Sequence, residues 1–341
     1  MNTLRIVGIG GGTGLPVVLR GLARQPFVDV SAIVTVADNG GSSGRLREGL
    51  GLPAVGDLRN CLVALAEQDS MLTELFQHRF VAGDVEGHSL GNLIVAALYQ
   101  RTGRLTTALE IARQLLPSKG RAFAATEVPA TLCAAFRDGT TIRGESQISA
   151  AGRSIERIWL EPNGPDPSPG VLEAIQEADA VVLGPGSLYT SLLPNLLVAG
   201  VTNAIRESSA IKILICNLMT QPGETDGFSA SDHLRVVQSH LGPVIDFCVV
   251  NSAVEPAGGA SYQTAGSQVV RCDTDEILSL GAVPVEEDLL TVQGEKIRHN
   301  VAKLGRLIVA VAREHAQGGN ASQAVFGIGG EAACLDHYVN V

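Results

Sequence analysis

Short apolar runs alternate along the chain with segments in which apolar residues recur at helical spacing. Residues 4–9 form a first apolar run, residues 15–22 have helical spacing, and residues 30–36 form a second run. Short apolar runs are typical of buried parallel strands, and apolar positions about three to four residues apart are typical of an amphipathic helix. This order predicts a right-handed βαβ unit at the start of the chain.

The same alternation returns in the second half of the chain and continues to residue 316. The segments predicted as strands are 180–183, 211–216 and 244–250, and those predicted as helices are 171–178, 230–241 and 301–316. We therefore predict an α/β fold with a Rossmann-like, doubly wound, mostly parallel sheet and helices on both faces.

The middle of the chain departs from this alternation. Residues 69–116 indicate mostly helix, and two strand-like runs at 131–136 and 141–145 then flank Asp138-Gly139. An Asp-Gly pair between such runs favours a hairpin turn. A further strand is predicted at 155–160.

These patterns set the expected domain organisation. We expect a single α/β domain over residues 1–320, with an antiparallel hairpin inserted at about 129–160. Residues 321–341 show no clear period, so we expect a C-terminal tail there and leave its flexibility open.

A glycine-rich loop, Gly10-Gly-Gly-Thr-Gly14, joins the first predicted strand to the first helix. In this arrangement the N–H groups at the helix N-terminus point at an anion, usually a phosphate. Glycine allows positive φ angles and a close approach of the ligand. The spacing is neither G-x-G-x-x-G nor a P-loop, because no lysine lies near it, so the loop predicts a phosphate-bearing ligand without naming its class. A plain strand-to-helix turn is the alternative.

A second strand, glycine loop and helix follow in the second half, where 180–183 runs into Gly184-Pro-Gly-Ser187. We expect both loops to hold phosphate groups. The loop residues predicted to contact the ligand are Gly11, Gly12, Thr13, Gly14, Gly186 and Ser187.

Polar side chains stand where other strands are expected to end, at the edge where open parallel sheets bind ligands. Asp38 lies in a polar glycine-rich loop, at a distance from the first loop that suits an acid bound to a ribose hydroxyl. An Asx turn is the alternative for Asp38. Asp57 and Asn60 come just before an apolar helix, where an N-cap is the simplest interpretation of Asp57. Asn217 ends another strand.

The segment Gly87-His-Ser-Leu-Gly91 matches the G-x-S-x-G nucleophile elbow. An elbow requires a hydrophobic strand before the serine, and residues 82–86 are too polar for one. Ser89 is therefore more simply the N-cap of the helix that follows. His88 and Asn92 would then point into a ligand cleft from the start of that helix.

Composition limits the classes of partner. The net charge of −10 argues against a nucleic-acid-binding protein, which normally carries a basic face. No apolar run reaches the roughly 20 residues that span a membrane. Six cysteines without a CxxC pair indicate reduced thiols, and the start of the chain lacks a signal-peptide pattern, so a cytoplasmic protein is expected. The histidines show no metal-ligand spacing, and no metal site is predicted from them.

Six segments between about residues 4 and 316 resemble, in order, the YvcK-type gluconeogenesis factors. That group is similar to the CofD-like proteins, the superfamily of 2-phospho-L-lactate transferase. The segments are Gly10–Pro16, Val36–Gly44, Gly56–Asn60, Gly87–Asn92, Gly184–Ser191 and Cys216–Glu224. The resemblance implies binding of UDP-sugars such as UDP-N-acetylglucosamine, a role in growth on gluconeogenic carbon sources, and control of cell wall and shape.

The resemblance also assigns roles to single residues. It places the arginine that binds the UDP-sugar at Arg298, in Ile297-Arg-His-Asn300. The transferase branch carries paired aspartates after its second strand and in a Pro-Asp-Leu-Asp motif, and these places here read Asp38-Asn39 and Gly56-Asp-Leu-Arg59. Half of those carboxylates are therefore replaced, which weakens the case for phosphotransfer.

Two hypotheses follow. The first is a nucleotide-sugar-binding regulatory protein whose ligand also contacts Asp38, Asn39, Ser42, Asp57, Asn60, His88, Asn92, Asn217 and Arg298. The second is a CofD-like transferase of a phosphoryl-linked nucleotidyl group, with Mg²⁺ and the catalytic candidates Asp38 and Asp57. The sequence leaves open whether the chain forms a homo-oligomer.

Overall fold

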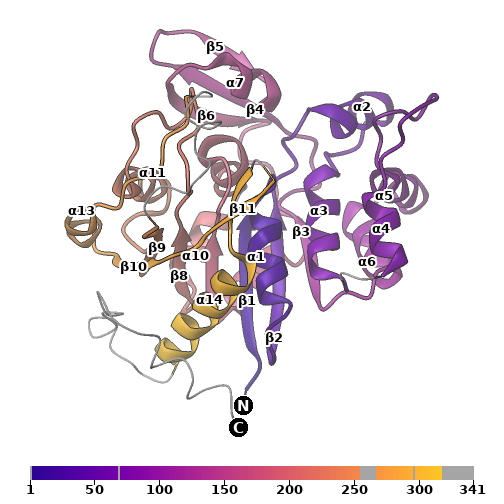
Figure 1. Ribbon diagram of the computed structural model, residues 1–341. Coiled ribbons are helices and arrows are strands. Elements are labelled where there is room, and N and C mark those ends of the chain that lie inside the picture. Colours follow the sequence, from indigo (N-terminus) through magenta and orange to yellow (C-terminus); the bar gives the residue numbers. More distant parts are fainter. Residues whose placement is uncertain (1, 68–69, 254–265, 295, 317–341) are drawn as a thin grey trace.

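A seven-stranded parallel sheet forms the centre of the computed structural model, which describes residues 2–67, 70–253, 266–294 and 296–316 (Figure 1). The strand order is β10-β9-β8-β7-β1-β2-β3, and each pairing is parallel. The predicted Rossmann-like sheet is therefore confirmed. The strands are β1 (Leu4–Gly10), β2 (Val28–Val34), β3 (Gly120–Ala124), β7 (Ala180–Leu183), β8 (Ile211–Ile215), β9 (Phe247–Asn251) and β10 (Val283–Glu287).

The order of the strands reverses between β1 and β7. From β1 the chain moves outward to β2 and β3, whereas from β7 it moves outward in the opposite direction to β8, β9 and β10. In an open α/β sheet such a reversal leaves a crevice at the carboxyl ends of the two central strands, where ligands bind. The two predicted glycine loops follow β1 and β7.

Helices cover both faces of the sheet, and the strands are accordingly apolar on both sides. One core contains residues of α1 (Leu15–Leu22), α3 (Gly56–Leu65), α4 (Met71–Gln77), α5 (Leu90–Thr102), α6 (Leu105–Leu115) and α14 (Val301–Ala316). The other contains residues of α8 (Val171–Gln176), η1 (Leu188–Leu192), α9 (Leu193–Leu196), α10 (Val201–Glu207), α11 (Ala230–Leu241) and α13 (Thr274–Ser279).

The helices α1 and α14 cross in front of β1 at a pair of glycines (Figure 1). A Cβ added to Gly21 would lie 2.4 Å from the carbonyl oxygen of Val301 and 3.1 Å from Gly305. A Cβ on Gly305 would lie 2.5 Å from the backbone of Gly21. Glycine at both positions therefore lets two helices approach more closely than side chains would permit.

The predicted hairpin is confirmed as part of a small antiparallel sheet. Strand β4 (Thr131–Phe136) pairs with β5 (Thr141–Arg143) on one side and with β6 (Ile155–Glu161) on the other. Helix α7 (Glu145–Ala151) lies between β5 and β6 in the chain. Figure 1 shows this sheet beyond the carboxyl edge of the parallel sheet, so the insert stands over the end at which ligands are expected.

Several predictions of local structure are wrong. The loop expected after β2 contains α2 (Gly41–Leu50), although glycine and serine fill its first turn. The stretch predicted as mostly helical at 69–116 does contain α4, α5 and α6, with an interruption at residues 78–89, which include two glycines and several polar residues. Strands β3 and β10 were not predicted, because their segments lack long apolar runs and are held by pairing with β2 and β9. The hairpin of β11 (Leu290–Gln293) and β12 (Lys296–His299) was missed for the same reason.

Two further expectations concern membranes and thiols. Among the described residues no single helix is long and apolar enough to cross a membrane, although the bent pair Leu188–Leu196 and Val201–Glu207 passes on length and composition. The prediction of buried thiols is confirmed for four of the five described cysteines. The expected tail at 321–341 lies outside the described residues.

Candidate functional site

The two glycine loops touch each other at the crevice between β1 and β7. A Cβ added to Gly14 would lie only 2.3 Å from the carbonyl oxygen of Pro185, and one on Gly186 would lie 3.4 Å from that of Gly11. Part of the glycine content is therefore required by contact between the loops. Neither loop is sealed, because Gly12, Gly14 and Gly186 are half-buried and Thr13 is exposed.

The first loop presents backbone donors at the start of α1. Within the described part of the chain, the N–H groups of Thr13 and Gly14 have no hydrogen-bond acceptor. Both lie where the positive end of the α1 dipole adds to the attraction for an anion. The loop can thus accept a phosphate at Thr13 and Gly14.

Other groups of the two loops already have partners inside the protein. The N–H of Gly12 donates to Oδ2 of Asp57 at 2.6 Å. The N–H of Gly186 donates to Oδ1 of Asn217 at 3.1 Å, and Nδ2 of Asn217 donates to the carbonyl of Gly186 at 2.8 Å. The oxygen and the nitrogen of the Asn217 amide therefore both hold the second loop, and the ligand contact of Asn217 stays a prediction.

Asp57 is not the N-cap that its position suggested. The N-cap of α3 is Val55, and the carboxylate of Asp57 reaches across to the first glycine loop. Burial raises the pKa of Asp57 to about 6, against the effect of the Gly12 N–H, and the negative charges of Asp38 and Glu145 raise it further.

Asn60 is three residues beyond Asp57 on α3 and half-buried, so both residues lie on the same face of the helix. That face is directed to the first glycine loop by the bond from Asp57. The pair therefore lines the same side of the site.

Asp38 and Asn39 form hydrogen bonds with different parts of the chain. Oδ1 of Asp38 accepts the N–H of Gly40 at 2.8 Å, so the alternative of an Asx turn is confirmed. Oδ1 of Asn39 accepts both the N–H and the hydroxyl of Ser146 at 2.9 Å, and its Nδ2 donates to Gln147 at 2.9 Å. Asn39 thus ties the loop to α7 of the insert, and its contact with a ligand stays a prediction.

Two carboxylates of the site were not found from the sequence. Glu224 accepts the hydroxyl of Ser187 at 2.5 Å, and burial raises its pKa. Burial, followed by the charge of Asp38, also raises the pKa of Glu145 on α7. Glu224 ends one of the segments that carry the family resemblance, which was an available signal, whereas Glu145 had none because it comes from the insert.

A buried polar cluster lies where α2 and α5 begin. Oγ of Ser42 is 2.9 Å from Nδ1 of His88 and accepts Nδ2 of Asn92 at 3.0 Å. The hydroxyl of Ser89 accepts the N–H of Asn92 at 3.2 Å and is fully buried. The N-cap interpretation of Ser89 is confirmed, and the structure does not present this serine as a nucleophile.

Arg298 reaches this end of the molecule on the hairpin of β11 and β12. The next residue, His299, is buried, and its pKa is lowered to about 4 by burial in spite of a hydrogen bond to the backbone of Cys216 at the end of β8. Arg298 points to the other side of the strand, is half-buried, and donates to the carbonyl of Ile297 at 3.1 Å. The contact of His299 with Cys216 therefore holds Arg298 near the carboxyl edge of the sheet.

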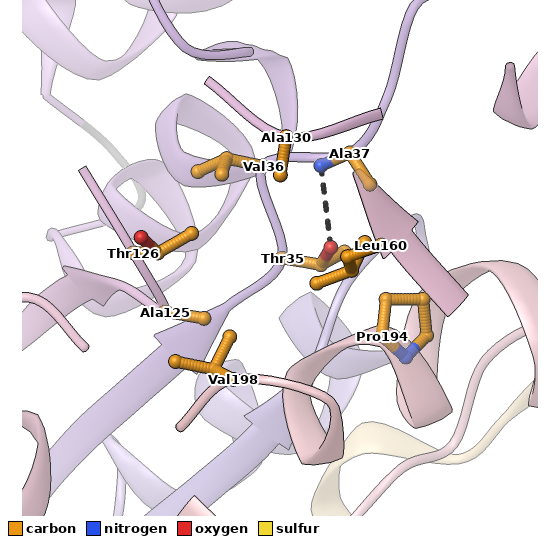
Figure 2. Close-up of a pocket in the computed structure, with 9 residues that line it drawn as sticks. All are labelled: Thr35, Val36, Ala37, Ala125, Thr126, Ala130, Leu160, Pro194 and Val198. Carbon is orange, nitrogen blue, oxygen red and sulfur yellow. Dashed lines mark hydrogen bonds between the residues drawn. The ribbon is translucent and has the colours of Figure 1, made fainter. Parts of the chain in front are cut away.

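A small apolar hollow backs the first loop, and Figure 2 shows nine residues that line it. Thr35 connects the two features, because its methyl group would lie 2.8 Å from a Cβ on Gly11. The dashed line in Figure 2 is the bond from the N–H of Ala37 to the hydroxyl of Thr35, at 3.3 Å. The cavity volume is about 10 Å³, far below the roughly 300–1,000 Å³ of ordinary ligand pockets, so the hollow does not hold a nucleotide.

Residues 6–290 match the family model described as 2-phospho-L-lactate transferase CofD. The chain belongs to this CofD family. It is also similar to the gluconeogenesis factor of Halalkalibacterium halodurans, with 44% identity over 91% of this chain and 97% of that protein. The gluconeogenesis factor of Bacillus subtilis is 42% identical over 91% of this chain and 98% of that protein.

A crystal structure of a protein from Bacillus halodurans has the same fold as this CofD family member. It matches with a TM-score of 0.87 and 43% identity, over 90% of this chain and all of the other. The predicted resemblance to gluconeogenesis factors within the CofD superfamily is therefore confirmed.

Proposed function

We propose that this protein is a cytoplasmic gluconeogenesis factor that binds a nucleotide sugar, with a UDP-sugar as the ligand, and acts as a regulator of growth and cell shape on gluconeogenic carbon sources. The relatives named gluconeogenesis factor, which this chain covers almost completely, support the physiological part. The geometry of the crevice supports the ligand.

The observation that carries the proposal is the contact of the two glycine loops at the reversal of strand order. The free N–H groups of Thr13 and Gly14 supply donors for a diphosphate, and Ser187 stands on the facing loop. A diphosphate would be repelled by the carboxylates near the loops, so the site also needs a positively charged side chain. These carboxylates belong to Asp38, Asp57, Glu145 and Glu224. Arg298 is the arginine held at this edge by its neighbour His299, and a guanidinium binds a phosphate with two parallel hydrogen bonds.

A phosphotransferase reaction is the second candidate, and the acidic residues support it. Asp38 and Asp57 lie close enough for the charge of one to raise the pKa of the other. Among the described residues no group of three or more possible ligands is placed to hold a metal ion. Mg²⁺ usually takes only one or two carboxylates together with substrate phosphates, so Asp38 and Asp57 suit Mg²⁺ only when the nucleotide completes the site.

A thermal-shift titration tests the first candidate. We expect UDP-N-acetylglucosamine and UDP to raise the melting temperature, because a ligand at about 100 times its Kd stabilises the folded protein by about 2.7 kcal/mol. Arg298→Ala should remove most of this effect. Arg306→Ala is the matched control, because Arg306 is exposed on α14 and has no bonded partner among the described residues.

The outcomes separate the two candidates. If none of UDP, UDP-N-acetylglucosamine, GDP and NAD raises the melting temperature, the nucleotide-binding proposal is wrong. If a nucleotide compound is consumed with Mg²⁺ and not with EDTA, the transferase reaction is favoured. Stabilisation without turnover supports a regulator.

A further inference from the structure

A line of buried hydrogen bonds runs from α3 to His88. Nε of Arg59 donates to Oδ1 of Asn92 at 3.3 Å, and both side chains are buried. Because the guanidinium can only donate, it fixes the amide of Asn92 with its oxygen towards Arg59. Nδ2 of Asn92 must then donate to Oγ of Ser42, at 3.0 Å.

The hydroxyl of Ser42 donates its own proton to His88. Oγ already accepts from Asn92, and Ser42 is only 5% exposed, so its own proton needs an acceptor inside the protein. In the described part of the chain the acceptor within reach is Nδ1 of His88, at 2.9 Å. Nδ1 therefore accepts, and a neutral imidazole in this state carries its proton on Nε2.

The surroundings keep His88 neutral and favour an anion beside it. Burial lowers the pKa of His88, and the charges of Arg45 on α2 and of Arg79 lower it further. Arg45 donates to the carbonyl of Glu86 at 2.7 Å and Arg79 to that of Gly87, so both guanidinium groups are held beside the segment that carries His88. The first turns of α2 and α5, with their positive dipole ends, meet at this point.

Nε2 of His88 has no partner among the described residues, although the side chain is only 9% exposed. This nitrogen is not among the buried unpartnered atoms of the described residues, so an external acceptor can reach it, and two cations and two helix N-termini make an anionic oxygen the acceptor that suits it. We propose that His88 donates its Nε2 proton to an anionic phosphate oxygen of the ligand, and that the Arg59–Asn92–Ser42 line sets this tautomer. The inference rests on the proposed function, since it concerns the same nucleotide sugar.

Two substitutions at one position separate the two ring nitrogens. The amide nitrogen of Gln lies near the position of Nε2, whereas that of Asn lies near Nδ1. We expect His88→Gln to weaken binding of UDP-N-acetylglucosamine about threefold and His88→Asn to weaken it tenfold or more. His315→Asn is the control, because His315 is exposed on α14 and should leave the affinity unchanged.

Nitrogen-15 NMR of the histidine rings reads the tautomer directly, without a variant that fails to fold. We expect the His88 signals of the wild type to show a protonated Nε2 and a bare Nδ1 at neutral pH. Ser42→Ala should produce a mixture of tautomers and a loss of affinity of a few-fold. Protonated Nδ1 in the wild type, or equal affinities of the Asn and Gln variants, would overturn the inference while the nucleotide-binding proposal stands. If the wild type binds none of UDP, UDP-N-acetylglucosamine, GDP and NAD, both are wrong.

Discussion

Replacing Asp57 by Asn should stabilise the folded protein at alkaline pH. The pKa of Asp57 rises from an ordinary value of 3.8 to about 6 because the folded protein buries its charge. One pKa unit corresponds to about 1.4 kcal/mol, so ionised Asp57 lowers the free energy of unfolding by about 3 kcal/mol at pH 8. Asn removes the charge and keeps an oxygen that accepts the N–H of Gly12.

The sign of the effect follows from the direction of the shift. Since folding raises this pKa, the contribution of Asp57 to stability is full below about pH 4 and is lost as the pH rises through about 6. The advantage of Asp57→Asn over the wild type should therefore be greatest above pH 7 and should shrink to about half at pH 5. Glu145 and Glu224 shift in the same direction, so the difference between variant and wild type is the quantity to compare.

Urea unfolding at pH 5 and pH 8 measures this difference. Trp159, the single tryptophan, lies in β6 and reports unfolding by its fluorescence, alongside circular dichroism. Asp84→Asn is the control, because Asp84 is exposed and should change stability by less than about 0.5 kcal/mol. This prediction is refuted if the variant is no more stable than the wild type at pH 8, or if its advantage does not fall at pH 5. Either result would show that the buried negative charge of Asp57 does not destabilise the folded protein.

Three other substitutions test separate parts of the structure. Gly305→Ala should lower the free energy of unfolding by about 2–4 kcal/mol, because its Cβ would meet the backbone of Gly21 at 2.5 Å. The control Gly49→Ala, which places its Cβ in open space on α2, should be neutral or stabilising by up to about 1 kcal/mol. Urea unfolding measures both changes. Asn217→Ala should release the second glycine loop, with a measurable loss of both melting temperature and UDP affinity. Ser89→Ala should cost about 1 kcal/mol as a lost cap, and a fluorophosphonate should label neither this variant nor the wild type; labelling of the wild type alone would restore the hydrolase alternative.

The sequence was most informative where local pattern decides structure. The apolar runs at β1, β7, β8 and β9 and the glycine loops after β1 and β7 were all found, because buried parallel strands and glycine turns leave a local signature. Strand β3 has no such signature, since its segment Gly-Arg-Ala-Phe-Ala becomes a strand only by pairing with β2.

Partners within the site could not be read from the sequence, because they are distant along the chain. Asp57 meets Gly12 across 45 residues, and Asn39 meets Ser146 across 107. A polar residue at the end of a strand can face a ligand or hold a neighbouring loop, and the position alone does not distinguish the two. Asn39, Asn217 and Asp57 all proved to form hydrogen bonds that hold loops.

The glycine crossing of α1 and α14 has a consequence for the order of synthesis. Helix α1 is translated almost 300 residues before α14, the helix that covers its glycine face and ends at residue 316. Strand β1 likewise waits for β7, which begins at residue 180, before both of its edges are paired. A segment that is translated early is thus completed late, and nascent chains that end before about residue 300 carry an unfinished crevice between β1 and β7.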